Sequence, residues 1–438
     1  MHSSPVHFHN GPHGSPMPCF EFSCSSPQLS LGFRRARSHH RSRGTRLGLA
    51  LIALALGGFA IGTTEFVAMG LLPEIARGVG ISIPAGGHVI SAYALGVVVG
   101  APILAGLGAR FPRRTLLLAL MAAFAAGNLL SALAPSYGTL LLARFAAGLP
   151  HGAYLGVAAL VAAELAPPAR RAQAVASVLL GLSVANVVGV PAATWLGQGL
   201  GWRAAFAASA VLGLITVAGV LRFVPLRPAD PAATLRRELG ALKRPQVLLA
   251  VATGAIGGGG LFAVYSYISP ILTERTGLPV GLVPVALAIW GLGMVFGAIV
   301  GGRLMDWRPV PAMLGAFVFM AAVFALFTVL SLNVVTAFVG VFALGMTIVL
   351  ATGMQVRLMD VSADAQTLGA ALNHSAFNIA NALGAWLGGA VLAAGYGLTA
   401  PMWVAVGLTL AGMALFAVAI RVPDRRTRAD RSLTAAAH

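Results

Sequence analysis

Long apolar segments alternate with short polar ones along most of the chain. Twelve segments are nearly free of charged residues: 47–72, 87–108, 115–134, 139–162, 174–198, 204–221, 246–271, 282–302, 310–331, 334–356, 365–392 and 398–420. A helix needs about 20 mostly apolar residues to cross a bilayer, whereas strands of a membrane barrel alternate apolar and polar residues over about ten positions. These segments are continuously apolar, so the pattern predicts an all-α polytopic membrane protein with twelve transmembrane helices.

Composition supports the same class of protein. Of the 438 residues, 58% are hydrophobic and only 9% are charged, whereas a soluble domain carries about 25% charged residues. So few charges cannot cover a surface that faces water. The composition therefore excludes a soluble enzyme, a disordered protein and a disulfide scaffold.

The distribution of basic residues predicts the orientation in the membrane. The chain has 29 basic and 12 acidic residues, a net charge of +17. If the N-terminus is cytoplasmic, 25 basic residues fall on the cytoplasmic side and three, Arg77, Arg203 and Arg275, on the other. Short cytoplasmic loops carry an excess of Lys and Arg, so we expect both termini in the cytoplasm and the protein in the cell (inner) membrane. The basic residues form no continuous patch, which argues against a nucleic-acid partner.

The first 44 residues differ from the rest of the chain. They are rich in Ser, Pro and His and contain no apolar run, so we expect residues 1–44 to be a disordered cytoplasmic leader. Cys19 and Cys24, the two cysteines of the chain, lie here at a spacing that fits no standard zinc pattern. We therefore expect no metal site, and no disulfide within the spans.

The apolar part of the chain contains an internal repeat. Asn186-x-x-Gly189 resembles Asn381-x-x-Gly384 at an offset of 195 residues, and each is followed by a Trp-Leu-Gly sequence. A second pair of similar sequences, around Ala109 and Asp306, has an offset of 197 residues. The repeat predicts two six-helix halves, 45–221 and 246–421, joined by a cytoplasmic loop at 222–245 and followed by a tail at 422–438. Gly96-x-x-x-Gly100 and Gly293-x-x-x-Gly297 are interpreted as helix-packing motifs.

Glu65 is the single carboxylate well inside a predicted span. A charged side chain at the bilayer centre costs at least about 2.5–3.5 kcal/mol, so an ionisable group there indicates function. Such a group can take up a proton on one side and release it on the other; the alternative is a structural, neutral Glu. Arg144 lies at a similar depth and is its expected electrostatic counterpart, unless its side chain extends to the interface.

Five further polar side chains are candidates for the lining of a substrate cavity. His151 lies seven residues after Arg144 on the same helix face. It either binds substrate or relays protons, or it is a packing residue with a hydrogen bond. His374, Asn378 and Asn381 follow at i, i+4 and i+7, which places them in one polar stripe on an apolar helix. Such a stripe is expected to face a cavity or another helix, and Asn186 is its counterpart in the repeat. Tyr265, Tyr267 and Trp290 are expected mainly to pack.

The residues of several spans resemble those of the major facilitator superfamily, in its drug/proton antiporter branch. The resemblance covers residues 45–422 and is carried by the following sequences: Gly62-Thr63-Thr64-Glu65-Phe66, Leu71-Leu72-Pro73, Arg144-x-x-x-Gly148-x-Pro150-His151-Gly152, Gly189-Val190-Pro191, Gly201-Trp202-Arg203 and Asn373-His374-Ser375 with Asn378 and Asn381. Within that superfamily, the chain resembles the arabinose-efflux-permease-like and chloramphenicol-resistance transporters. In the loop motif of that superfamily the basic residues Arg110, Arg113 and Arg114 are kept, but Ala109 and Pro112 replace its Asp and Gly; the second copy keeps Asp306.

The resemblance and the candidate residues together predict a proton-coupled exporter that works by alternating access. Glu65 and Arg144 would couple proton entry to the release of a small drug, such as a phenicol, or of a sugar. The alternative is an importer or facilitator of a sugar or other polar solute on the same fold. A membrane enzyme or a sensor is disfavoured, because no nucleophile set, nucleotide motif or soluble output domain is recognisable. We expect a monomer that uses no cofactor and takes its energy from the proton gradient.

Overall fold

A computed structural model of the protein describes residues 27–108, 111–167, 170–226, 244–362 and 366–422. The chain forms two compact units, Met1–Arg46 and Leu47–His438, and the description below concerns the second, together with the first part of helix α1, which belongs to the first unit. Its helices are α1 (Pro27–Gly70), α2 (Leu72–Gly78), α3 (Ile83–Gly108), α4 (Arg113–Leu133), α5 (Tyr137–Gly148), α6 (His151–Leu165), α7 (Arg171–Val184), η2 (Ala185–Gly189), α8 (Val190–Leu200), α9 (Trp202–Phe223), α11 (Pro245–Tyr265), α12 (Ile268–Pro270), η4 (Ile271–Arg275), η5 (Val280–Leu282), α13 (Val283–Trp307), α14 (Pro309–Leu330), α15 (Val334–Met346), α16 (Val349–Ser362), α17 (Gln366–Ala393) and α18 (Ala400–Ala419).

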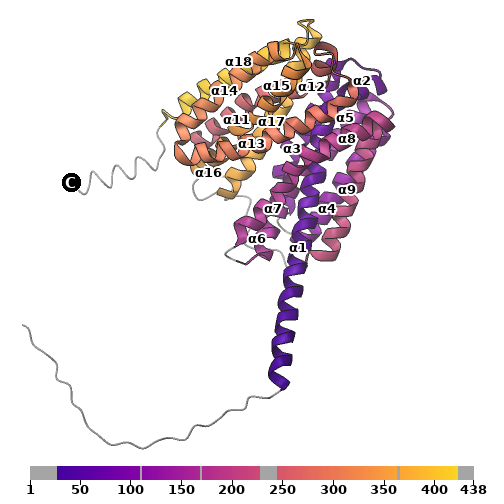
Figure 1. The fold of residues 1–438 in the computed structure, drawn as a ribbon, viewed down its shortest axis with the longest axis vertical. Coiled ribbons are helices and arrows are strands. Elements are labelled where there is room, and N and C mark those ends of the chain that lie inside the picture. The colour runs from indigo at the N-terminus through magenta and orange to yellow at the C-terminus, as the bar shows by residue number, and fades with distance from the viewer. Residues whose placement is uncertain (1–26, 109–110, 168–169, 227–243, 363–365, 423–438) are drawn as a thin grey trace, which may run out of the picture. The chain divides into compact units, whose positions relative to one another are not determined.

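Twelve helical stretches in the described part of the chain are long and apolar enough to cross a membrane, and each overlaps one of the twelve predicted segments. The predicted fold class is therefore confirmed. We call α1–α9 the N-half and α11–α18 the C-half (Figure 1). The boundaries predicted from the repeat stay a prediction.

The prediction for the leader needs a correction. Residues 27–44, expected to be disordered, belong to helix α1, which begins at Pro27; residues 1–26 lie outside the described part. Helix propagation adds one hydrogen bond for each residue that is fixed, whereas starting a new helix is costly. A polar segment next to a stable apolar helix can therefore continue that helix, although its composition gives no apolar signal.

Two spans are interrupted where proline occurs. Pro150 separates α5 from α6, and Pro191 follows the π-helix η2 within the span α7–η2–α8. Proline has no backbone N–H and disturbs the preceding turn, and neighbouring helices or local π geometry satisfy the freed groups in a membrane protein. Both breaks lie beside residues that the sequence singled out, His151 and Asn186.

The internal repeat is visible in helix packing at glycines. Gly96 and Gly148 bring α3 against α5 so closely that an added Cβ would lie less than 3.0 Å from a backbone oxygen, that of Phe145 or of Tyr93. The same contacts recur 197 residues later at Gly293 and Gly345, which meet the backbone oxygens of Phe342 and Trp290. Gly100 and Gly297 likewise meet Leu149 and Met346. The glycine motifs are therefore packing motifs, because small residues let membrane helices approach closely.

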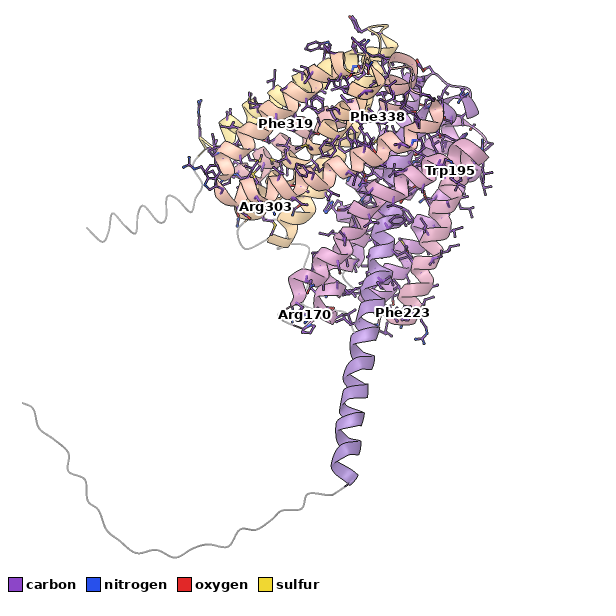
Figure 2. The ribbon with its side chains drawn as sticks, in the orientation of Figure 1. Arg170, Trp195, Phe223, Arg303, Phe319 and Phe338 are labelled. Carbon is purple, nitrogen blue, oxygen red and sulfur yellow. The ribbon has the colours of Figure 1, made fainter. Side chains whose placement is uncertain are left out.

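The two halves meet along a seam formed by two helix pairs. In the N-half the contributing elements are α3 and the span η2–α8, which pack on α17 and α13 of the C-half respectively. We call the end with the connections α3–α4, α6–α7, α13–α14 and α16–α17 the basic end. Arg170, Phe223 and Arg303 lie toward it in Figure 2, whereas Trp195 lies nearer the opposite end.

The described hydrogen bonds across the seam lie between the middle of the spans and the end opposite the basic end. Ser91 Oγ donates to the carbonyl of Ala382 at 3.0 Å, and Gln198 Nε2 donates to that of Val280 at 3.0 Å. Figure 1 shows the halves together near α2 and α12 and apart toward the start of α7 and the end of α16, which lie at the basic end. The structure thus has the halves joined at the end opposite the basic end.

The glycine contacts generate a stability prediction. Gly148→Ala and Gly345→Ala should each lower the stability by about 1–3 kcal/mol, because the new methyl group has to displace backbone. Thermal unfolding in detergent, followed by size-exclusion chromatography, measures the effect. Gly156→Ala is the control, since nothing lies within 4 Å of its Cβ position. Equal unfolding temperatures for Gly148→Ala and Gly156→Ala would contradict the packing argument.

Candidate functional site

Glu65 lies on α1 at the seam between the halves. Its side chain is 4% exposed, within a segment that is otherwise apolar except for Thr63 and Thr64. Asn381 Nδ2, from α17 of the C-half, donates to Glu65 Oε1 at 3.4 Å. The carboxyl group predicted from its isolated charge is therefore in contact with the opposite half of the molecule.

Arg144, on α5, is completely buried and does not extend to the interface. Its guanidinium donates to Thr64 Oγ1 at 3.3 Å and to the Thr64 carbonyl at 3.1 Å. Its charge also lies over the rings of Tyr93 and Phe206, 4.2 and 4.9 Å from their centroids. Within the described residues Arg144 and Glu65 form no ion pair, so the guanidinium binds the neighbour of Glu65 instead of the carboxylate.

Asn128 completes this arrangement and was not singled out in the sequence. The Thr64 hydroxyl donates to Asn128 Oδ1, and Asn128 Nδ2 donates to the carbonyl of Phe124 at 2.9 Å. Arg144, Thr64 and Asn128 thus connect α5, α1 and α4. A signal was present, because Asn128 is an amide side chain in the middle of an apolar helix, where an unpaired polar group is costly.

His151 is buried at the start of α6 and packs through a hydrogen bond. Its Nδ1 lies 3.1 Å from the hydroxyl of Tyr93, whose ring also faces Arg144. Tyr93 therefore connects the two residues that the sequence placed on one helix face. Helix α6 also contacts α17 of the C-half, so His151 lies on a helix that reaches the seam.

The predicted polar stripe on α17 divides into residues with different partners. His374 is half-buried, whereas Asn378 and Asn381 are each 1% exposed. Asn378 Nδ2 donates to the carbonyl of His374 at 3.0 Å, within the same helix, while Asn381 reaches Glu65. The Oδ1 atoms of both amides are buried without a hydrogen-bond partner among the described residues. A role of these residues in lining a substrate cavity stays a prediction.

Asn186, the counterpart of Asn381 in the repeat, also lies at the seam. It belongs to the π-helix η2, and its Nδ2 donates to the carbonyl of Leu182 at 2.9 Å. Its backbone oxygen packs against Gly291 of α13. A Cβ added at Gly291 would lie 2.4 Å from this oxygen, which is closer than real Cβ atoms come. The two repeat-related asparagines therefore mark the two helix pairs by which the halves meet, but Asn186 has no carboxylate partner in the described residues.

An aromatic group lies next to Glu65 and spans the two halves. Tyr265 of α11 stacks on Trp290 of α13 with ring centroids 4.0 Å apart and an interplanar angle of 16°. Phe66 of α1 lies 5.8 Å from Tyr265, measured between ring centroids. All three side chains are buried. As the sequence suggested for Tyr265 and Trp290, these rings pack, and they contribute to the contact between the halves.

The loop residues of the basic end have partners that the sequence did not identify. Arg113 forms an ion pair with Glu164 near the end of α6, and Arg114 donates to the carbonyl of Leu221 at the end of α9. Glu164 thus supplies an acid to a loop motif in which Ala109 replaces the usual Asp. Asp306 is exposed in α13, and Arg110 lies outside the described residues. Their role in conformational change stays a prediction.

The geometry of Arg144 generates a second prediction. Arg144→Lys keeps the charge but loses the planar donor pair that binds Thr64. We expect a stability loss of about 1.5–3 kcal/mol, the range for hydrogen bonds to charged groups, measured by thermal unfolding in detergent. Arg77→Lys is the control, because its side chain is 76% exposed. The same unfolding temperature for both variants would contradict a specific role for the guanidinium.

Comparisons with known proteins agree with this architecture. Residues 54–373 match the family model of the Major Facilitator Superfamily. The chain is 44% identical to the inner membrane transport protein YdhP of Escherichia coli (strain K12), over 85% of this chain and 96% of that protein. It is 36% identical to a chloramphenicol resistance protein of Streptomyces lividans, over 85% and 96% of the two chains.

Solved structures share the fold. A mutant of the nucleoside transporter NupG superposes with a TM-score of 0.71 at 14% identity, covering 85% of this chain and 99% of that one. A bacterial homologue of the human lysosomal transporter Spinster, in an inward-facing and unoccupied conformation, gives a TM-score of 0.61 at 16% identity, covering 85% and 95%. The twelve spans, the repeated packing and the matched family model lead to one conclusion: this chain is a multi-pass membrane transporter, not an enzyme, and it belongs to the Major Facilitator Superfamily.

Proposed function

We propose that the protein exports a small molecule from the cell in exchange for protons, by alternating access. The observation that carries the proposal is the buried carboxyl group of Glu65, which lies at the seam between the halves and contacts Asn381 of the C-half. A group placed there can link its protonation to the relative position of the two halves. The protein would act as a monomer in the cell (inner) membrane, without a cofactor, driven by the proton gradient.

The chemistry of the carboxyl group supports proton coupling. An ionisable residue within a membrane-spanning segment is rare and typical of ion pathways and proton relays. Burial in a medium of low dielectric favours the neutral acid, and a nearby positive charge favours the ionised form. Glu65 experiences both influences, because it is buried and Arg144 binds the adjacent residue. Such a balance lets the group bind and release protons during a transport cycle.

The distribution of basic residues supports an orientation. We place the basic end in the cytoplasm, because cytoplasmic loops carry more Lys and Arg. The end at which the halves are joined then faces outward, and the described conformation is inward-facing. Glu65 and Arg144 would serve as the proton-coupling pair of this carrier, and Arg113, Arg114 and Asp306 as residues of its conformational loops.

The names of relatives support a small drug or a sugar as substrate. One relative is a chloramphenicol resistance protein, and a probable sugar efflux transporter of Pasteurella multocida is 28% identical over 83% of this chain and 88% of that one. Amide and imidazole groups such as those of Asn378, Asn381, Asn186, His151 and His374, placed among apolar side chains, suit amphiphilic drugs and sugars alike.

Transport in vesicles tests the proposal. In acid-loaded everted membrane vesicles, the wild-type protein should release protons when chloramphenicol or arabinose is added. Glu65→Gln should reduce this release, and uphill transport, to the background of vesicles without the protein, because the amide cannot carry the proton. Glu74→Gln is the control, since Glu74 lies outside the apolar spans on the short helix α2.

The outcomes separate the two candidate mechanisms. Uphill efflux retained by Glu65→Gln would contradict the assignment of Glu65. Downhill flux without proton release by the wild type would support a facilitator or importer on the same fold.

A further inference from the structure

We propose that a groove on the membrane-facing side of the C-half binds one anionic phospholipid, with an acyl chain between α13 and α14 and the phosphate group at Arg308. The bound lipid belongs to the leaflet at the basic end. Glu65 and its partners do not line the groove, so the inference goes beyond the proposed function and does not rest on proton coupling.

The groove lies between α13 and α14, over the junction of α15 and α16, and has a volume of about 500 Å³. Its lining is mostly apolar and includes Leu304, Ala316, Phe319, Met346 and Val349. Gly315 leaves it open on the side of α14, because a Cβ added there would have nothing within 4 Å. Apolar walls without neighbours lose van der Waals contacts. An acyl chain from the bilayer supplies those contacts.

The face of α13 that lines the groove points away from the N-half. Gly291 packs on Asn186 of the N-half, whereas Val300 lines the groove nine positions later. Nine residues are about two and a half helical turns, so the two residues lie on opposite sides of α13. The large apolar side chains of Phe296 and Ile299, close to this face, are exposed. The groove therefore opens toward the lipid.

The mouth of the groove carries an aromatic and a basic side chain. Trp307, which is 74% exposed, and Arg308 line it, and the guanidinium lies over the indole ring, 5.1 Å from the ring centroid. Figure 2 shows the neighbouring Arg303 nearer the basic end than Phe319, which lies deeper in the groove. Tryptophan is typical of the membrane–water interface, and basic pockets between spans bind anionic lipid head groups.

The positive charge at the mouth is not compensated by an acid of the protein. Neither Arg303 nor Arg308 forms an ion pair with a described residue. Asp306 and Asp360 are exposed and do not line the groove, and Asp306 lies about half a turn from Leu304 around α13. Helix α14 begins directly after Arg308 without a side-chain cap, so the positive end of its dipole adds to the charge. A phosphate group complements this mouth.

The corresponding part of the N-half is closed by the protein itself. At the repeat offset of 197 residues, Leu118 takes the place of Gly315 and packs against the core of the N-half. The arginines of that loop have protein partners, because Arg113 pairs with Glu164 and Arg114 donates to a backbone carbonyl of α9. Among the described residues the C-half has neither the leucine nor such partners. Its groove and its arginines are therefore available to a ligand.

Two matched controls are present in the chain. Arg222 is also exposed at the basic end and lies over an aromatic ring, 5.5 Å from the centroid of Phe223, but it does not line the groove. Gly407 of α18 is exposed like Gly315 and also has nothing within 4 Å of an added Cβ. Arg222→Gln and Gly407→Leu thus repeat the changes of Arg308→Gln and Gly315→Leu away from the groove.

Fluorescence quenching of Trp307 in bilayers tests the proposal. The full-length protein is reconstituted in phosphatidylcholine with a small share of brominated phosphatidylglycerol or, separately, of brominated phosphatidylcholine with the same chains. Each protein is measured with and without Trp307→Phe, and the difference is the quenching of Trp307. In the otherwise unchanged protein, phosphatidylglycerol should be preferred at this site at least about fivefold, the factor expected from one arginine near an anionic lipid.

The variants decide between the outcomes. Arg308→Gln should lower the preference for phosphatidylglycerol about fivefold, and Arg303→Gln together with Arg308→Gln should bring both lipids to near equality. Gly315→Leu should lose at least half of the preference, because the leucine fills the space of the chain. Equal quenching by both lipids in the unchanged protein would overturn the proposal. The same result would follow if Arg308→Gln matched Arg222→Gln, or if Gly315→Leu matched Gly407→Leu.

Discussion

The burial of a guanidinium among membrane-spanning helices is the constraint on which the N-half depends. A positive charge removed from water is tolerated only when its donors are bound and its charge is compensated. Arg144 is compensated in part by two hydrogen bonds to Thr64 and by the rings of Tyr93 and Phe206, while its Nε has no partner among the described residues. Because these partners come from α1, α3 and α9, one side chain on α5 connects four spans.

This arrangement also places the carboxyl group of Glu65. Thr64 is held by Arg144 and Asn128 on one side of α1, so the next residue, Glu65, points to a different side of the helix and reaches α17. The two charged groups therefore have separate partners. The arginine binds the neutral Thr64, and the carboxyl group of Glu65 contacts Asn381 of the C-half.

The glycine contacts pack the helices of each half closely together. Backbone packs on backbone where Gly96 meets Gly148 and where Gly293 meets Gly345, so no side chain separates the helices at these positions. The seam between the halves differs, because it combines aromatic rings with a few hydrogen bonds such as that of Ser91 with Ala382. Tight packing within halves and a sparsely bonded seam between them suit a protein whose halves rock as units.

The sequence by itself determined the number of spans and the fold class, and it singled out Glu65 and Arg144 as candidates, because apolar length and isolated charge are properties of a single segment. It also revealed the repeat, since both copies keep their glycines. Tertiary structure alone decided the partners: Thr64 instead of Glu65 for Arg144, Glu65 for Asn381 instead of a neighbour in its own helix, and Glu164 for Arg113. These contacts join residues that are 51 to 316 positions apart, and helical periodicity fixes the face of a side chain on its own helix but not the helix that packs against that face.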